Sequence, residues 1–272
     1  MKKNFTYILL FLFIISCNEK ADDKTYIYNG QSVKIQRIKS TDSLFSGYGG
    51  ESYKSGALKS LTIFENGKII DTLIRFYENG NIKEKGMVVN NMEYGWWIYN
   101  NENGKVNKKI EWFGINDSIY PNQEIFYDDY GNIKIGPSNY FELQIPDTLQ
   151  IGKNIARIDN YVSKYNDIDK RYLFVLIENS YSDLGKKIDT FTYGSQNPFF
   201  GINAEKTGNK IVEGRIKEQT LKTDTIEGDS LSLVIKEHYK YFKKEVYVSD
   251  SGKRSELDSI LRAKFRKMTK DN

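Results

Sequence analysis

The chain has 272 residues and a formal net charge of +4, with one cysteine, one histidine, four prolines and twenty tyrosines. Its last twenty residues carry seven basic and three acidic side chains, so residues 17–252 sum to −2. A body so close to neutral lacks the concentrated basic stripe that nucleic-acid binding needs, and we expect no nucleic-acid partner. One cysteine excludes an internal disulfide, and many tyrosines with few prolines favour strands over disorder.

The N-terminus has the features of a signal peptide. Lys2 and Lys3 precede an apolar run over residues 5–15, which is shorter than the ~20 residues that cross a bilayer. Cys17 follows this run and the small residue Ser16. The arrangement resembles the lipobox of bacterial lipoproteins, which implies that residues 1–16 are removed, that Cys17 is acylated, and that the acyl chains hold the protein on a membrane. A cysteine buried at a signal-anchor edge is the alternative.

This resemblance places the mature chain in the cell envelope, anchored to a membrane that we expect to be the outer one, facing the periplasm or the cell surface. Residues 17–46 then form a polar tether with room for a first strand. The acidic pair Asp22 and Asp23 fits a solvated linker. The same pair also resembles the surface-export signal of some Gram-negative lipoproteins.

A short repeat dominates residues 47–136. An aromatic residue, two polar residues and a glycine recur at 53–56, 64–67 and 77–80, with looser copies further on. The turns are expected at Gly56, Gly67, Gly80, Gly104 and Gly131. Asn-Gly pairs at 66–67, 79–80 and 103–104 favour two-residue type I′ hairpins, whose central residues both need positive φ. Successive hairpins are expected to stack into one elongated sheet, because a single hairpin cannot bury its apolar face.

The repeat resembles a known family. Residues 77–86, followed by Tyr94-Gly95-Trp96-Trp97-Ile98-Tyr99, are similar to the variant MORN repeat, and the resemblance extends over about residues 47–136. The first copies lack the Gly-Trp element, and the last has an extra residue. The resemblance implies a meander of β-hairpins. Some family members are antitoxin-like, so an antitoxin-like inhibitor is one alternative function.

The regular spacing of glycines ends at residue 140, and longer strands are expected beyond it. Strands are expected at 140–145, 151–158, 172–177, 187–193, 210–219, 231–236 and 239–248, which predicts a β-sandwich of Ig-like shape over residues 137–250. Leu231, Leu233 and Ile235 alternate with other residues, as on a strand with one buried face. The fold class expected for the whole chain is therefore mostly β: a hairpin meander, a sandwich and a short C-terminal helix.

Residues 251–272 read as a basic amphipathic helix. Ser255 and Asp258 fit a capping box. Apolar side chains line one helical face: Leu257, Ile260, Leu261, Phe265 and Met268. Docking on the sandwich is the interpretation we favour, and a position on anionic lipid headgroups is the alternative.

The sequence offers little for catalysis. His238, the sole histidine, has no nucleophile motif to serve, and we expect no catalytic residue, no metal site and no cofactor. Asp128-Asp129 and the pair Asp167 and Asp169 lie in turn-like contexts, where aspartate usually bonds its own backbone. Use of these aspartates as glycosidase carboxylates or calcium ligands is the alternative.

Aromatic residues of the repeats are the candidate binding face: Trp96, Trp97, Trp112, Tyr77 and Tyr99. Neighbours in a strand point to opposite sides, so one of Trp96 and Trp97 should be buried and the other exposed. The interpretation we favour is that they form the core ladder of the repeats, and a binding face for protein or sugar is the alternative. The sequence thus predicts a membrane-anchored, non-catalytic lipoprotein with a protein partner. A carbohydrate-binding or carbohydrate-processing surface protein is the alternative from a different functional class.

Overall fold

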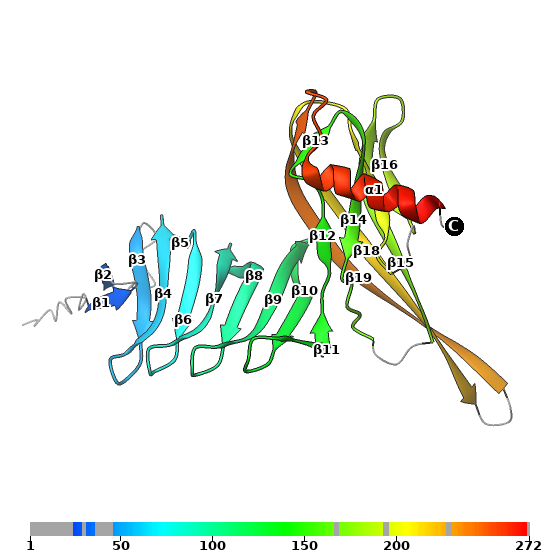
Figure 1. Ribbon diagram of the computed structural model, residues 1–272. Coiled ribbons are helices and arrows are strands. Elements are labelled where there is room, and N and C mark those ends of the chain that lie inside the picture. The colour runs from blue at the N-terminus through cyan, green and yellow to red at the C-terminus, as the bar shows by residue number, and fades with distance from the viewer. Residues whose placement is uncertain are drawn as a thin grey trace, which may run out of the picture.

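The computed structural model describes residues 24–28, 31–35, 46–165, 169–192, 196–226 and 230–270. Cys17, the expected signal peptide and much of the expected tether lie outside these residues. Strands make up most of the described chain and a single helix follows them, which confirms the mostly β fold class (Figure 1). The first two strands, β1 (Lys24–Tyr28) and β2 (Gln31–Ile35), form a small hairpin.

The repeats build one nine-stranded antiparallel sheet, called here the repeat sheet. Its strands are β3 (Gly47–Ser52), β4 (Leu58–Glu65), β5 (Lys68–Ile69), β6 (Thr72–Phe76), β7 (Ile82–Val89), β8 (Met92–Asn100), β9 (Val106–Ile115), β10 (Ser118–Tyr127) and β11 (Ile133–Asn139). Each strand pairs with the next along the chain, except that β6 pairs with β4 beside the short β5. The result is the hairpin meander expected from the spacing of the glycines (Figure 1).

In the repeat sheet, the turns at one end of the strands differ from the turns at the other end. All five predicted turn glycines have positive φ. Asn66-Gly67 closes a two-residue turn in which both residues have positive φ, as expected for type I′. The same prediction is wrong for Asn79-Gly80 and Asn103-Gly104, because only the glycine of each pair has positive φ.

Gly80 ends a three-residue loop instead. Its N–H donates to the carbonyl of Tyr77 over 2.9 Å, and the N–H of Tyr77 donates to the carbonyl of Asn81. This is a type I turn followed by a left-handed glycine, the next most common hairpin connection after the two-residue turns. The loops at Gly56, Gly104 and Gly131 repeat this bonding, and the four loops lie at one end of the strands (Figure 1).

Side chains fasten each repeat to the next. The hydroxyl of Tyr53 donates to the carbonyl of Phe76 over 2.7 Å, and that of Tyr77 donates to the carbonyl of Asn100 over 2.9 Å. Both bonds span 23 residues, which is close to the repeat length. The aromatic position of the motif therefore ties neighbouring hairpins together at the glycine-loop end.

Trp97 forms the core of the repeat sheet on one face. Its side chain is fully buried, and its indole N–H donates to the carbonyl of Met87 over 3.0 Å. The ring lies over Gly86, where an added Cβ would approach it to 2.4 Å. The guanidinium of Arg75 covers the ring at 5.7 Å. Glycine is therefore required at residue 86 because the indole fills the space of a side chain.

The second half of the described chain is a two-layer sandwich. One sheet has the order β12-β14-β17 and the other β13-β19-β18-β15-β16. The strands are β12 (Glu142–Gln144), β13 (Thr148–Gln150), β14 (Gly152–Asp159), β15 (Lys170–Tyr181), β16 (Gly185–Phe191), β17 (Phe199–Ala204), β18 (Gly208–Ile226) and β19 (Ser230–Ser249). Both sheets contribute to a single core, for example Ile158, Phe200, Val175, Ile216 and Phe242.

Several strand predictions were wrong. Strands β13 and β17 were missed. Strand β15 extends to residue 181 instead of 177, and β18 extends to residue 226 instead of 219. The two strands predicted at 231–236 and 239–248 are one strand, β19. The apolar residues of β19 change sides along its length, since Phe242 and Val246 are buried while Leu233 and Ile235 are exposed. The alternation at Leu233 and Ile235 thus does not mark a buried face.

The expected helix is α1 (Glu256–Lys270), which lies against β14. The hydroxyl of Ser255 accepts the N–H of Asp258 over 3.2 Å, so the cap is present. Leu261 is buried, and Phe265 meets Phe199 edge to face at 5.4 Å. Ile260, predicted on the apolar face, is exposed instead. Docking on the sandwich is therefore the position of this helix.

No helix in the described parts of the chain has the length and apolar character that a bilayer crossing requires.

The repeat sheet meets the sandwich through a polar contact. Asn122 accepts the N–H of Tyr241 over 2.7 Å and donates to its carbonyl over 2.8 Å. The ring of Phe113 stacks on that of Tyr241 at 5.7 Å. Gln123 accepts the N–H of Phe141 over 2.8 Å. These contacts join β9 and β10 to β19, and β10 to the segment before β12.

The packing of Trp97 gives a first prediction. Gly86→Ala should lower the free energy of unfolding by about 1–3 kcal/mol, because the methyl group overlaps the indole and forces the ring or the strand to move. Guanidinium denaturation followed by tryptophan fluorescence measures this loss.

Gly136→Ala is the matched control, since a Cβ at that strand glycine meets nothing within 4 Å. Equal stability of the two variants would contradict the packing described for Trp97.

Candidate functional site

The face of the repeat sheet opposite Trp97 carries a groove. Cross-strand pairing places Leu61, Ile74, Lys85 and Ile98 in one row across four strands. Because side chains alternate along a strand, Trp96 lies on this face while Trp97 lies on the other. The groove therefore comes from the positions of each strand that do not build the core around Trp97.

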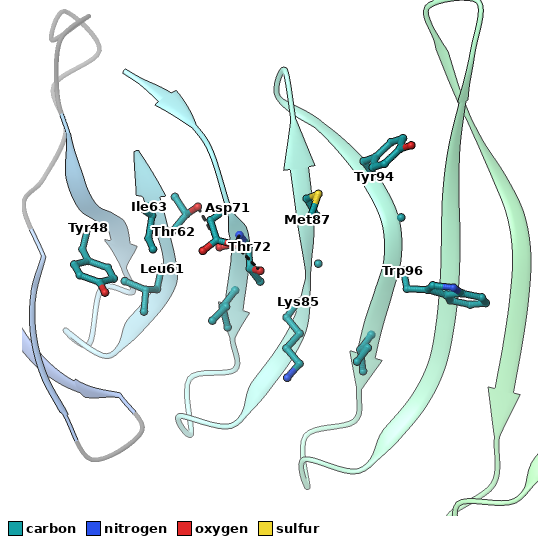
Figure 2. Close-up of a pocket in the computed structure, with 14 residues that line it drawn as sticks. Tyr48, Leu61, Thr62, Ile63, Asp71, Thr72, Lys85, Met87, Tyr94 and Trp96 are labelled. Atoms are coloured by element: carbon teal, nitrogen blue, oxygen red, sulfur yellow. Dashed lines mark hydrogen bonds between the residues drawn. The ribbon is translucent and has the colours of Figure 1, made fainter. Parts of the chain in front are cut away.

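The groove has a volume of about 680 Å³ and is lined by five strands, from β3 to β8. Tyr48 lies at one end and Trp96 at the other, with Leu61, Lys85 and Met87 between them (Figure 2). The rest of its lining is Thr62, Ile63, Asp71, Thr72, Ile74, Gly86, Tyr94, Gly95 and Ile98. Tyr48, Met87, Tyr94 and Trp96 all expose more than a third of their surface. An aromatic and apolar surface of this kind is open to solvent on the described chain.

Polar side chains of the groove bond mostly to one another. Asp71 accepts the N–H of Thr72 over 2.7 Å and its hydroxyl over 3.2 Å. The hydroxyl of Thr62 donates to the carbonyl of Thr72 over 3.3 Å. Both bonds from Thr72 end on one oxygen of Asp71, and the larger part of the groove lining is apolar or aromatic, so a ligand would meet mainly apolar side chains.

Lys85 is the cationic group of the groove. It lies between Ile74 and Ile98 in the cross-strand row, and its ammonium forms no ion pair within the described residues. Next to Trp96, the carboxylate of Glu111 accepts the side-chain amides of Asn122 and Gln123 over 2.6 and 2.7 Å. Burial raises the pKa of Glu111. Lys85 is therefore the charge in the groove with room for an external partner.

The five aromatic residues named as a candidate binding face do not share a face. Trp97 is fully buried, whereas Trp96 is 41% exposed. Tyr99 and Trp112 lie on the Trp97 side, where the indole N–H of Trp112 donates to the Tyr99 hydroxyl over 3.4 Å. Tyr77 fastens two repeats together. Four of the five thus serve the structure of the repeats, and only Trp96 reaches the groove.

The Trp97 side carries a charged cluster of its own. Arg75 pairs with Glu84 over 2.5 Å and with Glu93 over 3.6 Å. The Tyr99 hydroxyl donates to Glu93 over 3.4 Å. Burial, together with the two carboxylates, raises the pKa of Tyr99 to about 12. Three adjacent strands, β6, β7 and β8, contribute to this cluster, which forms a cross-strand ladder.

Sequence reasoning missed Tyr48, Met87 and Tyr94 as groove residues. Tyr48 lies in the segment Gly47-Tyr48-Gly49-Gly50, which forms a regular edge strand. Tyr94, Trp96 and Ile98 alternate in one strand, and this alternation was the available signal.

The other candidates for chemistry lie apart from the groove. Asp128 accepts the backbone N–H groups of Tyr130 and Asn132, as expected for a turn aspartate. Asp169 accepts the N–H of Thr223, while Asp167 lies outside the described residues. His238 is half-buried on β19. In the described part of the chain no three histidine, cysteine or carboxylate side chains gather as metal ligands would.

No protein-family model matches the chain, and no match was found among curated proteins or solved structures.

The two neighbouring tryptophans give a second prediction. Trp97→Ala should lower the free energy of unfolding by about 3–5 kcal/mol, because it leaves a cavity over Gly86. Trp96→Ala should cost about 1 kcal/mol or less, because its ring is half in solvent. Chemical denaturation followed by circular dichroism compares the two directly, and equal losses would contradict the assignment of faces.

Proposed function

We propose that the chain is a lipid-anchored, non-catalytic module of the cell envelope that binds an extended, largely apolar protein segment in the groove of the repeat sheet. The observation that carries this proposal is the open apolar surface between Tyr48 and Trp96. Contiguous apolar patches of this kind on soluble domains mark sites of interaction. The anchor through Cys17 and the kinship with variant MORN repeats are parts of the same proposal.

The shape and chemistry of the groove favour a protein segment. It crosses five strands about 4.8 Å apart, so it offers roughly 19 Å to an extended chain. Met87 supplies an adaptable apolar contact and Trp96 a rigid aromatic one, both of which are common in binding surfaces. The partner we infer carries several apolar side chains in a row.

Charge complementarity adds one acidic residue to that partner. Lys85 lies in the middle of the row with its ammonium free of any ion pair in the described chain. A carboxylate on the bound segment would satisfy it, whereas a purely apolar segment would cover the ammonium without a partner. The preferred segment is therefore apolar with a central aspartate or glutamate.

A carbohydrate ligand is the second candidate. Exposed aromatic rings such as Trp96, Tyr94 and Tyr48 can act as stacking platforms for sugars. Sugars also bind through many hydrogen bonds to polar side chains, whereas the middle of this groove is lined by the apolar side chains of Leu61, Ile74 and Ile98. The protein segment is therefore preferred.

The anchor is tested by metabolic labelling with an alkyne palmitate. The wild-type chain should become labelled, and Cys17→Ser should lose the label because the sulfur that carries the acyl group is gone. Immunoblotting of the same samples controls for expression, and labelling that persists at wild-type strength in the variant would refute the anchor.

The groove is tested by selecting linear peptides from a displayed library against the detergent-solubilised full chain. Enriched sequences should be apolar with an acidic residue, and Trp96→Ala should weaken their binding at least tenfold by removing the aromatic contact. Fluorescence anisotropy measures the affinities.

Tyr130→Ala is the matched control, because Tyr130 is an aromatic residue almost fully exposed at a glycine loop outside the groove. Lys85→Met should selectively weaken peptides that contain an acidic residue. Failure to enrich any peptide, combined with Trp96-dependent signals on a glycan array, would favour the carbohydrate ligand instead.

A further inference from the structure

A group of buried charges lies where residues 161–165, called here the latch segment, cross from β14 toward the five-stranded sheet. Lys240 of β19 is fully buried. Its ammonium donates to the carbonyl of Val162 over 2.9 Å and lies 3.7 Å from the centre of the Tyr161 ring. The lysine thus holds the latch segment through both its backbone and an aromatic ring.

Glu218 of β18 holds the same segment from the neighbouring strand. It is fully buried, and one of its carboxylate oxygens accepts the Tyr161 hydroxyl over 3.1 Å. The register pairs Glu218 directly with His238, so the two side chains lie on one face. The other oxygen of Glu218 and Nδ1 of His238 are both buried, and neither has a hydrogen-bond partner within the described chain.

Tyr165 closes the far end of the latch segment. Its ring meets that of His238 edge to face at 6.3 Å, and its hydroxyl donates to the carbonyl of Glu237 over 3.4 Å. The ammonium of Lys236 lies 5.5 Å from the Tyr165 ring. His238 is therefore covered by the segment that it contacts.

The latch segment also holds the connection to the repeat sheet. The N–H of Val162 donates to the carbonyl of Tyr140 over 2.8 Å, and Tyr140 follows β11 in the chain. Tyr241, next to Lys240, is the residue that Asn122 bonds from the repeat sheet. The buried group and the contact between the two halves therefore share adjacent residues of β19.

We propose that the latch segment is an acid-released latch: protonation of His238 against Lys240 drives residues 161–165 off the β18–β19 face and loosens the repeat sheet from the sandwich. This inference does not depend on what the groove binds.

The charges around His238 favour release. Positive groups reach this region from three elements: Lys240 and Lys236 of β19, Arg171 of β15 and Lys164 of the latch segment. Glu218 is the acidic group that faces them from β18, with the phenols of Tyr161 and Tyr165 beside it. A proton on His238 therefore adds a positive charge to a buried site that already has more cations than anions.

The direction of the pH dependence follows from the pKa values. Burial, with help from Lys240 and Lys164, lowers the pKa of His238 from 6.5 to about 4 in the closed state. Once the segment leaves, the imidazole regains an ordinary pKa and binds its proton more tightly. Acid therefore favours the open state, and the ratio of open to closed forms rises by up to about tenfold per pH unit as the pH falls from 6.5 to 4.

Lys240 affects the stability of the closed state in a different pH range. Burial lowers its pKa from 10.5 to about 7, so the closed state also weakens as the pH falls from 10.5 to 7. Below pH 7 this contribution is complete, and His238 is the group in contact with the latch segment whose pKa is lowered into the acid range.

The test uses the purified full chain between pH 7.5 and 4. His238 is the only histidine, so its ring resonance can be followed by NMR without assignment. The wild-type imidazole should titrate well below pH 6.5. Hydrogen exchange corrected for intrinsic rates should show that peptides covering residues 161–165 lose protection in that range while β15 stays protected.

His238→Gln should keep the latch segment protected at pH 5, because the amide cannot take up the proton. Lys240→Met should reduce the pH range over which acid favours the open state, because removal of the nearest cation brings the pKa of His238 in the closed state closer to 6.5. Lys243→Met, an exposed lysine on the same strand, is the control and should behave as wild type.

Three results would overturn the proposal: a histidine that titrates near 6.5 in the folded chain, acid opening of His238→Gln equal to wild type, or loss of protection in residues 161–165 only together with β15. The NMR titration needs no variant, so the test stands even where a substitution prevents folding.

Discussion

The packing of one indole on one glycine organises the repeat sheet. Trp97 occupies the space above Gly86 and donates to the carbonyl of Met87, so β7 and β8 have a single register that satisfies it. A slip by one residue would move Trp97 to the other face and expose it. Because neighbours alternate, burial of Trp97 leaves Trp96 on the opposite face, where it forms one end of the groove. The binding surface is thus a geometric consequence of the core.

A second constraint joins this sheet to the sandwich. The pairing of β9 with β10 skips a residue between Pro121 and Gln123, which leaves Asn122 outside the ladder as a bulge. Its free side chain then bonds both backbone groups of Tyr241, as a neighbouring strand would. The oxygen and one N–H of a side-chain amide have the geometry of a peptide group, so a single side chain can cover part of the open edge of β19. The nitrogen of Asn122 also donates to Glu111.

Features that recur along the chain or follow local rules could be predicted from the sequence, whereas contacts formed once between distant residues could not. The turn glycines, the opposed tryptophans and the Ser255 cap all follow from local rules. The three-residue loops were misjudged because an Asn-Gly pair suits two kinds of hairpin, and the chain beyond it decides between them. Strand β19 was split because its apolar residues change sides where it leaves the sandwich. The Asn122 contact spans 119 residues and has no local signature.

The buried charges of β19 are hard to explain by stability. Replacing a buried ionic group with apolar residues of similar size is often neutral or stabilising, so the burial of Lys240 and Glu218 does not by itself explain their presence. What they provide is specificity, since each must find a polar partner and both find it in residues 161–165. Lys240 and Tyr241 are adjacent, and they bind the latch segment and Asn122 respectively. A shift of β19 that breaks one contact therefore strains the other, so this strand couples the groove-bearing sheet to the sandwich.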